Sequence, residues 1–134
     1  MNNAKLTAGA IGTTLAYIFG SFDSMLITLI IFICIDFLSG FTRAWVKKEF
    51  CSSKFYIGGV KKIGIVLIII VATQIDRLVL DGQTVVRTAA LSYYIACEGF
   101  SILENWGGLG LPLPKAVKNA LKKLKQEDDD HDNK

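Results

Sequence analysis

The sequence contains few of the residue types that build metal and catalytic sites. Only one of its 134 residues is histidine, His131, and it lies in an acidic segment near the end of the chain. The three cysteines, Cys34, Cys51 and Cys97, include no Cys-x-x-Cys pair. A disulfide framework, a zinc cluster and a histidine–cysteine nucleophile pair are therefore not expected.

Motifs for nucleotide binding and metal-dependent hydrolysis are also missing. The chain has no G-x-x-x-x-G-K-[ST], G-x-G-x-x-G or H-E-x-x-H segment. Glu98 and Glu104 lie off a shared helix face, which argues against a paired-carboxylate hydrolase. Two prolines against 12 glycines exclude Pro-rich and collagen-like chains. We expect a protein that is not an enzyme and needs no cofactor or metal.

What the sequence has in excess is apolar side chain. Hydrophobic residues make up 51% of the chain, charged residues make up only 20%, and the mean hydropathy is +0.42. A single domain of this length has too little interior to hide so much apolar surface. The surplus is expected to face a lipid bilayer.

Four apolar segments are expected to form helices. They are residues 6–22, 25–45, 63–80 and 84–103. The second is the strongest, because its 21 residues match the roughly 20 that a helix needs to cross a bilayer. The third is slightly short but still able to span with its flanks. A Gly58-Gly59 pair is expected to form a turn before the third helix.

The first and fourth segments each allow two interpretations. The first is a retained helix or a signal peptide, and the single Lys5 before it favours the retained helix. The fourth carries Arg87 and Glu98, so it either spans the membrane or lies in its interface. The expected fold class is an all-α, multi-pass integral membrane protein with three to four transmembrane helices and a C-terminal amphipathic helix.

Small residues recur every four positions in the first segment, at Ala8, Gly12, Ala16 and Gly20. On a helix this spacing makes a smooth stripe, which lets two helices approach closely inside a bilayer. We expect these residues to mediate helix association and the chain to form a homo-oligomer.

Charged residues inside the apolar segments are the candidates for function. They are Asp36, Arg43, Asp76, Arg77, Arg87 and Glu98. A charge in hydrocarbon is costly, so it normally faces a partner charge, a bundle interior or water. Asp36 can share a helix face with Arg43, and Asp76 could pair with Arg87 across a turn. Two interpretations remain open: structural pairing, and the lining of a wet oligomeric interface or pore.

The end of the chain is polar. Residues 107–114 form a Gly/Pro connector, which separates the transmembrane region of residues 1–106 from a helix over residues 115–126. One face of this helix is basic, with Lys115, Lys118, Lys122 and Lys125. It is expected to lie on an anionic membrane surface or, alternatively, to pack on a protein partner. Residues 127–134 form an acidic tail.

The positive charges predict an orientation. Residues 43–62 contain six bases and one acid, while the turns near Asp23 and Asp81 contain no base. Because short basic loops stay inside the cell, four spans would place the basic loop and the C-terminus in the cytoplasm. Since the basic clusters flank membrane segments, and Tyr93, Tyr94 and Trp106 look like interface anchors, no nucleic-acid partner is expected.

A set of short motifs now suggests a family. The first half of the set is ID-x-x-SG-x-x-R-A (35–44), SSK (52–54), GG-x-x-K (58–62) and ID-R-L (75–78). The second half is YYIACEGFSILEN (93–105) with GLGLPLP (108–114). Together they resemble the bacteriophage holin family that includes the clostridial toxin-secretion holin.

The resemblance implies a function. Holins accumulate in the bacterial cytoplasmic membrane, oligomerise and open nonspecific lesions, which release an endolysin and cause host lysis; relatives are linked to toxin secretion. The lipid bilayer, copies of the same chain and an endolysin or toxin are then the expected partners. Two alternatives remain, namely a small selective channel or transporter subunit and a membrane-anchored adaptor.

Overall fold

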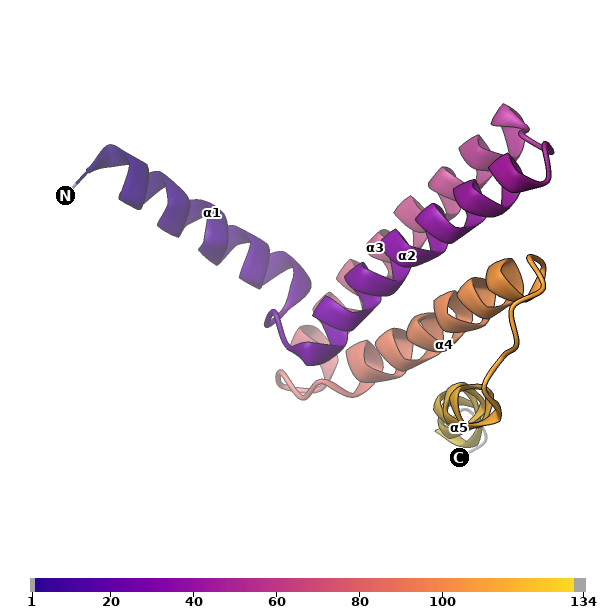
Figure 1. The fold of residues 1–134 in the computed structure, drawn as a ribbon. Coiled ribbons are helices and arrows are strands. Elements are labelled where there is room, and N and C mark those ends of the chain that lie inside the picture. The colour runs from indigo at the N-terminus through magenta and orange to yellow at the C-terminus, as the bar shows by residue number, and fades with distance from the viewer. Residues whose placement is uncertain (1, 132–134) are drawn as a thin grey trace.

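The computed structural model describes the backbone of residues 2–131 and the side chains of residues 2–123. In this part of the chain there are five α-helices and no strand, so the expected all-α class is confirmed. The helices are α1 (Asn3–Phe19), α2 (Ser24–Val46), α3 (Ser52–Val79), α4 (Val85–Gly107) and α5 (Lys115–His131). Figure 1 shows α2 and α3 running in opposite directions, α4 running in the same general direction as α2, and α5 crossing beside α4.

The helices α2 and α3 are antiparallel and joined by a short loop. We call them the hairpin; an N-cap begins it, and aromatic rings pack together at its loop end. Asp23 begins α2 because its Oδ1 accepts a hydrogen bond from the backbone N–H of Leu26 at 3.0 Å. At the loop end of the hairpin, the ring of Phe55 contacts the rings of Phe37 and Phe41, with centroids 5.9 and 5.8 Å away. These ring contacts join the end of α2 to the start of α3.

The helix α4 packs against both members of the hairpin and makes the core. Each of the three helices supplies two residues to the buried apolar cluster, which consists of Leu26, Leu29, Ile65, Ile69, Leu91 and Ile95. Their spacings of three or four residues place each pair on one helix face. The polar groups described below lie on the continuation of these same faces.

Two helices, α2 and α3, are long and apolar enough to cross a membrane, which is fewer than the three to four that the sequence predicts. Only 22% of the apolar stretch of α2 and 17% of that of α3 is buried, so their outer faces remain apolar and uncovered. The other helices differ: α1 has 17 residues, and α4 carries Arg87 and Glu98. A hairpin of two apolar helices is therefore the part of this fold best matched to lipid.

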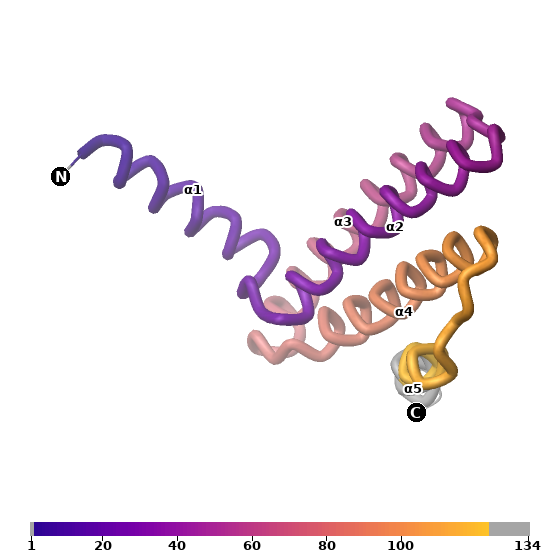
Figure 2. The backbone as a smooth tube through the Cα atoms, viewed as in Figure 1, coloured from indigo at the N-terminus to yellow at the C-terminus, as the bar shows by residue number. Residues whose placement is uncertain are grey.

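The helix α1 leaves the rest of the molecule (Figure 2). None of its residues is buried, and it contacts α3. Among the described residues, the upper part of the small-residue stripe is uncovered, since an added Cβ at Gly12 would meet nothing within 4 Å, whereas at its lower end the Ala16 carbonyl accepts a hydrogen bond from Arg77 and Gly20 faces Arg87. Gly20 lies just beyond the helix, with φ of 78°.

Helix boundaries differ from the expected ones mainly at α3. It begins at Ser52, so the predicted turn at Gly58-Gly59 is wrong and both glycines lie inside the helix. The fourth helix continues to Gly107 instead of ending near residue 103. The last helix continues to His131, which makes the first part of the acidic tail helical; residues 132–134 of that tail lie outside the described residues.

Candidate functional site

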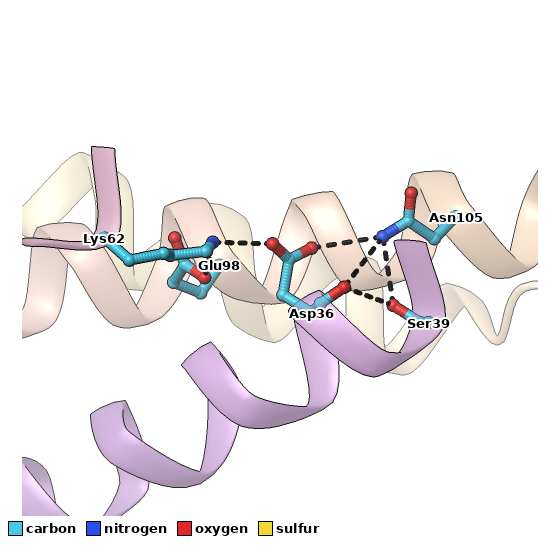
Figure 3. A network of polar contacts seen from close by, with 5 residues as sticks. All are labelled: Asp36, Ser39, Lys62, Glu98 and Asn105. Atoms are coloured by element: carbon cyan, nitrogen blue, oxygen red, sulfur yellow. Dashed lines mark hydrogen bonds and ion pairs between the residues drawn. The ribbon is translucent and has the colours of Figure 1, made fainter. Parts of the chain in front are cut away.

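Three helices meet at one half-buried lysine. Lys62 of α3 donates to Asp36 of α2, with Nζ 2.6 Å from Oδ2, and also pairs with Glu98 of α4 (Figure 3). The two acidic residues are only 8% and 5% exposed. Two carboxylates and one ammonium therefore share a site that excludes most water, and each helix contributes one charge.

Amide and hydroxyl groups extend this cluster along α2 and α4. Asn105 Nδ2 donates to Asp36 Oδ1 at 3.2 Å and to Ser39 Oγ at 3.0 Å. The Ser39 hydroxyl donates to the backbone carbonyl of Asp36 at 3.0 Å. We call the five residues Asp36, Ser39, Lys62, Glu98 and Asn105 the polar network. Its members satisfy one another, as buried polar groups must.

A second charged cluster lies at the other end of the hairpin and centres on Arg87, which is 2% exposed. Its Nη1 donates to Asp23 Oδ2 at 2.7 Å. Its Nε donates to the carbonyl of Phe19 at 2.9 Å, and its Nη2 to that of Ser21 at 2.7 Å. The guanidinium of one α4 residue thus holds the whole link between α1 and α2.

The pKa of Asp23 reflects this contact. Partial burial pushes the pKa of the Asp23 carboxyl up, but the hydrogen bond and positive charge of Arg87, together with the backbone N–H of Leu26, outweigh burial. The pKa therefore lies below its ordinary value. Because the folded-state pKa is lowered, this carboxylate stabilises the fold at neutral pH and loses that contribution as the pH falls.

Asp76 of α3 caps the start of α4. Its Oδ1 accepts a hydrogen bond from the backbone N–H of Val86 at 2.9 Å, and its Oδ2 from that of Arg87 at 2.8 Å. Thr84, the residue at the N-cap position of α4, makes no side-chain cap bond of its own. A carboxylate on a neighbouring helix therefore satisfies the free N–H groups and the positive end of the α4 dipole.

The end of α1 is satisfied in the same way by α3. Gln74 Nε2 donates to the carbonyl of Ile18 at 3.2 Å. The Thr73 hydroxyl lies 3.3 Å from the carbonyl of Phe19, but its shorter hydrogen bond, 2.8 Å, goes to the carbonyl of Ile69 in its own helix. Arg77 Nη2 donates to the carbonyl of Ala16 at 3.2 Å, and its guanidinium lies 4.2 Å from the centre of the Tyr17 ring. The last carbonyls of a helix have no partner within it, so these contacts anchor α1 by its C-terminal turn.

The charges singled out in the sequence meet in part as expected. Asp76 contacts Arg87 as expected, but it accepts a hydrogen bond from the backbone N–H of Arg87. The guanidinium of Arg87 pairs with Asp23 instead. Arg43 donates to the carbonyl of Glu104 at 3.4 Å, so its hydrogen bond goes to α4 and not to Asp36. Their role as pore-lining residues stays a prediction.

Sequence reasoning missed Lys62, because it assigned this residue to a loop. A signal was present in the spacing along α3. The buried or half-buried positions Lys62, Ile65, Ile69, Ala72, Thr73 and Asp76 recur every three or four residues. Extending the apolar face of the third segment backward by one turn would have placed Lys62 on the face that meets α4.

The basic face of α5 is exposed at Lys115, Lys118 and Lys122, whereas the side chain of Lys125 lies outside the described residues. Leu121 on the same helix is 6% exposed and packs against α4. A Cβ added to Gly99 would lie 2.7 Å from Leu121 Cδ2, so the absence of a side chain at Gly99 makes room for this contact.

Comparisons with known proteins give a consistent result. The model of the bacteriophage holin family matches residues 13–126. The chain is 41% identical to an uncharacterized 14.9 kDa protein in the nagH 3′ region of Clostridium perfringens, over 92% of this chain and 94% of the relative. It is 34% identical to a probable holin of Bacillus phage phi105, over 85% of this chain and 83% of the relative. No solved structure matches significantly.

The family match extends from the middle of α1 into α5, so it includes both charged clusters. Among the described residues, no group of three or more His, Cys, Asp or Glu side chains is placed to hold a metal ion. The matched family and the two apolar helices indicate a non-enzymatic membrane protein. The chain belongs to the bacteriophage holin family.

Proposed function

We propose that this protein is a phage holin that oligomerises in the bacterial cytoplasmic membrane and opens nonspecific lesions, through which an endolysin or toxin leaves the cell. One observation carries the proposal beyond family membership. The helices present apolar outer faces to lipid, while a polar network of mostly buried groups lies between them. Such a chain is suited to accumulate harmlessly as a closed unit and to line a wet lesion after rearrangement.

In the single folded chain, which we call the closed unit, the acidic residues of the polar network have a basic partner. Asp36 and Glu98 have Lys62 as their partner, so they do not need to face lipid before assembly. Opening a lesion would separate α4 from the α2–α3 hairpin and expose this network to water. Breaking a buried ion pair without solvation costs about 3–5 kcal/mol, so the separation is favourable only where a neighbouring open subunit supplies water. This requirement makes opening cooperative.

Association begins with α1 in this mechanism. None of its residues is buried, and an added Cβ at Gly12 in the stripe of Ala8, Gly12 and Ala16 would meet nothing within 4 Å, which leaves room for a second helix there. The anchoring of its C-terminal turn by Gln74 and Arg77 fixes the direction in which α1 leaves each subunit. Neighbouring subunits can then join through α1 while their charged clusters remain closed.

The charge distribution supports an orientation with the α2–α3 loop and α5 in the cytoplasm. The C-terminal ends of α2 and α4 lie at the same end of the molecule (Figure 1), and Arg43 contacts the Glu104 carbonyl there. The basic loop and the lysine-rich start of α5 therefore follow helices that end on one side. The acidic turns at Asp23 and Asp81 lie at the opposite end.

Induced expression in a bacterium tests the proposal. Viability, uptake of a small impermeant dye and release of a cytoplasmic enzyme are followed in cells with and without a co-expressed endolysin. A holin gives an abrupt loss of viability after a delay, and lysis only when the endolysin is present. Normal growth with uptake of one defined solute would instead indicate a selective transporter. Loss of the effect only on deletion of α5 would indicate an adaptor.

A further inference from the structure

A cavity of about 950 Å³ lies between α2, α3 and α4, beside the polar network. Its volume is in the range of pockets that enclose a drug-sized ligand. Phe37 and Phe55 form apolar parts of its wall near the loop of the hairpin, and Ile65 and Ile68 form further apolar parts along α3. Glycines at positions 58 and 64 also line it, and a Cβ added at either would meet nothing within 4 Å.

Basic side chains gather on the lining of this cavity. Arg43, Lys54 and Lys61 line it together with a single further acid, Glu49. The fourth base, Lys62, already forms ion pairs with Asp36 and Glu98, so it is not available to a ligand in the cavity. Lys54 and Lys61 are exposed and lie two helical turns apart on α3. The cavity lining therefore combines apolar walls with four bases and three acids, a surplus of one positive charge.

The depth of these cations in a membrane is indicated by the aromatic residues around them. The rings of Phe41, Phe50 and Phe55 contact one another at the loop end of the hairpin, and Trp45 stacks on Phe41. Tryptophan and tyrosine side chains concentrate at the level of lipid headgroups, and Trp45 and Tyr56 are both exposed at this end. The basic rim is thus placed where phosphates lie, and the apolar walls continue toward the hydrocarbon.

We propose that this cavity binds one anionic phospholipid. Lys54, Lys61 and Arg43 hold the phosphate, and the upper part of an acyl chain lies along Ile65 and Ile68. A free phosphate ion would use the cations but not the apolar walls, and the acidic tail of a second copy, residues 127–134, has no apolar side chain to lie along those walls. The proposal needs only a membrane location and does not depend on lesion formation.

Lipid binding by the purified full chain in a mild detergent tests the charge requirement. Phosphatidylglycerol and phosphatidylcholine are titrated separately, and bound lipids are counted by native mass spectrometry. We expect one phosphatidylglycerol per chain, held at least tenfold more tightly than phosphatidylcholine, as several basic contacts to one headgroup predict. Equal retention of the two lipids would overturn the proposal, as would displacement of phosphatidylglycerol by millimolar inorganic phosphate.

Matched variants locate the site. Lys54→Gln with Lys61→Gln should weaken phosphatidylglycerol binding about tenfold, because both rim charges are lost. The control, Lys47→Gln with Lys48→Gln, removes two charges from the same loop region but none from the cavity lining, and should change binding less than about twofold. Equal losses in the two double variants would mean that only overall charge attracts the lipid, which contradicts the proposed site.

A second pair of variants tests the apolar wall without changing charge. Gly64→Leu places a side chain inside the cavity, whereas Gly59→Leu places the same side chain on α3 away from the cavity lining. Circular dichroism checks that both variants keep their helices. Reduced phosphatidylglycerol binding by Gly64→Leu alone supports the proposal, and unchanged binding by Gly64→Leu overturns it.

Discussion

Lys62 and Asp36 lie 26 positions apart in the sequence, yet Nζ of one is 2.6 Å from Oδ2 of the other in the interior of the helix bundle. The same ammonium also forms an ion pair with Glu98. A single lysine therefore pairs with carboxylates from two helices that it does not belong to. Because the network contains two acids and one base, its stability depends on that lysine more than on either acid.

The first prediction follows from this imbalance. Lys62→Met should lower the free energy of unfolding by about 3 kcal/mol or more, because two carboxylates are left buried without a cation. Lys61→Met, at the neighbouring exposed position, is the control and should change it by less than about 0.5 kcal/mol. Unfolding in mixed micelles, followed by circular dichroism, measures both. Similar stability of the two variants would show that the ion pairs contribute little.

Replacing the carboxylates tests their part in triggering. Asp36→Asn and Glu98→Gln keep the side-chain shapes but remove the charges that Lys62 holds together. Weaker pairing makes separation of α4 easier, so each variant should lyse cells earlier at equal abundance in the membrane. Glu104→Gln replaces an exposed acid on α4, the helix of Glu98. It is the control and should keep the wild-type lysis time. If Asp36→Asn and Glu98→Gln both follow the wild-type schedule, these carboxylates are not part of the trigger.

The link between α1 and α2 gives a third prediction. Gly20 has φ of 78°, and a Cβ there would lie 2.9 Å from Nε of Arg87. Gly20→Ala therefore adds both backbone strain and a clash with the buried guanidinium. Gly82→Ala isolates the strain, because Gly82 has φ of 82° and nothing within 4 Å of an added Cβ. We expect a loss of about 1 kcal/mol for Gly82→Ala and clearly more for Gly20→Ala.

Limited proteolysis at residues 20–23 provides the readout for this pair. Loss of the Arg87 contacts should free the link and speed its cleavage in Gly20→Ala only. Equal cleavage rates in the two variants would indicate that Arg87 does not hold the link.

Local sequence patterns predict some of these features and not others. The helix α2 could be predicted because its long apolar run has only one interpretation. The start of α3 could not, since Gly58-Gly59 has low helix propensity, about 1 kcal/mol per glycine, and packing of the face containing Lys62 and Ile65 outweighs it. Partners far apart in sequence, such as Asp76 with the start of α4, depend on tertiary packing, which no local pattern encodes.

The docking of α5 illustrates the same limit. Its amphipathic pattern is compatible with a membrane surface or with a protein surface. The choice depends on Gly99, whose missing side chain admits Leu121 and lies 22 positions earlier on another helix. Composition and periodicity could therefore predict that an apolar face exists, but not what it meets.

Association through α1 gives a fourth prediction. Gly12→Leu adds bulk in the middle of the small-residue stripe, where the single chain offers no contact within 4 Å. It should leave the monomer folded and weaken oligomers in crosslinking, with a shift in lysis time. Thr14→Leu places the same leucine side chain on the opposite face of α1 and should have little effect on either measurement. Equal crosslinking by both variants would show that the stripe is not the contact.

The orientation gives the fifth prediction, and Cys51 reports it. This residue lies between α2 and α3, and the backbone N–H groups of Lys54 and Ser53 hold the pKa of its thiol below its ordinary value. A larger thiolate fraction at neutral pH makes it a fast-reacting probe. With Cys34→Ala and Cys97→Ala, an impermeant maleimide should label Cys51 in inverted vesicles but not in intact cells.

The control for orientation uses the other end of the hairpin. Gln83→Cys, placed in a chain whose three natural cysteines are removed, lies in the exposed turn between α3 and α4 and should be labelled from outside intact cells. Both measurements are made before the lytic delay ends, with retention of a cytoplasmic enzyme as proof that the membrane is intact. Because thiolate reacts, labelling of Cys51 in vesicles should rise with pH, beginning at a lower pH than for an ordinary cysteine. Labelling of Cys51 from outside intact cells would reverse the proposed orientation and place the basic loop and α5 on the outer face.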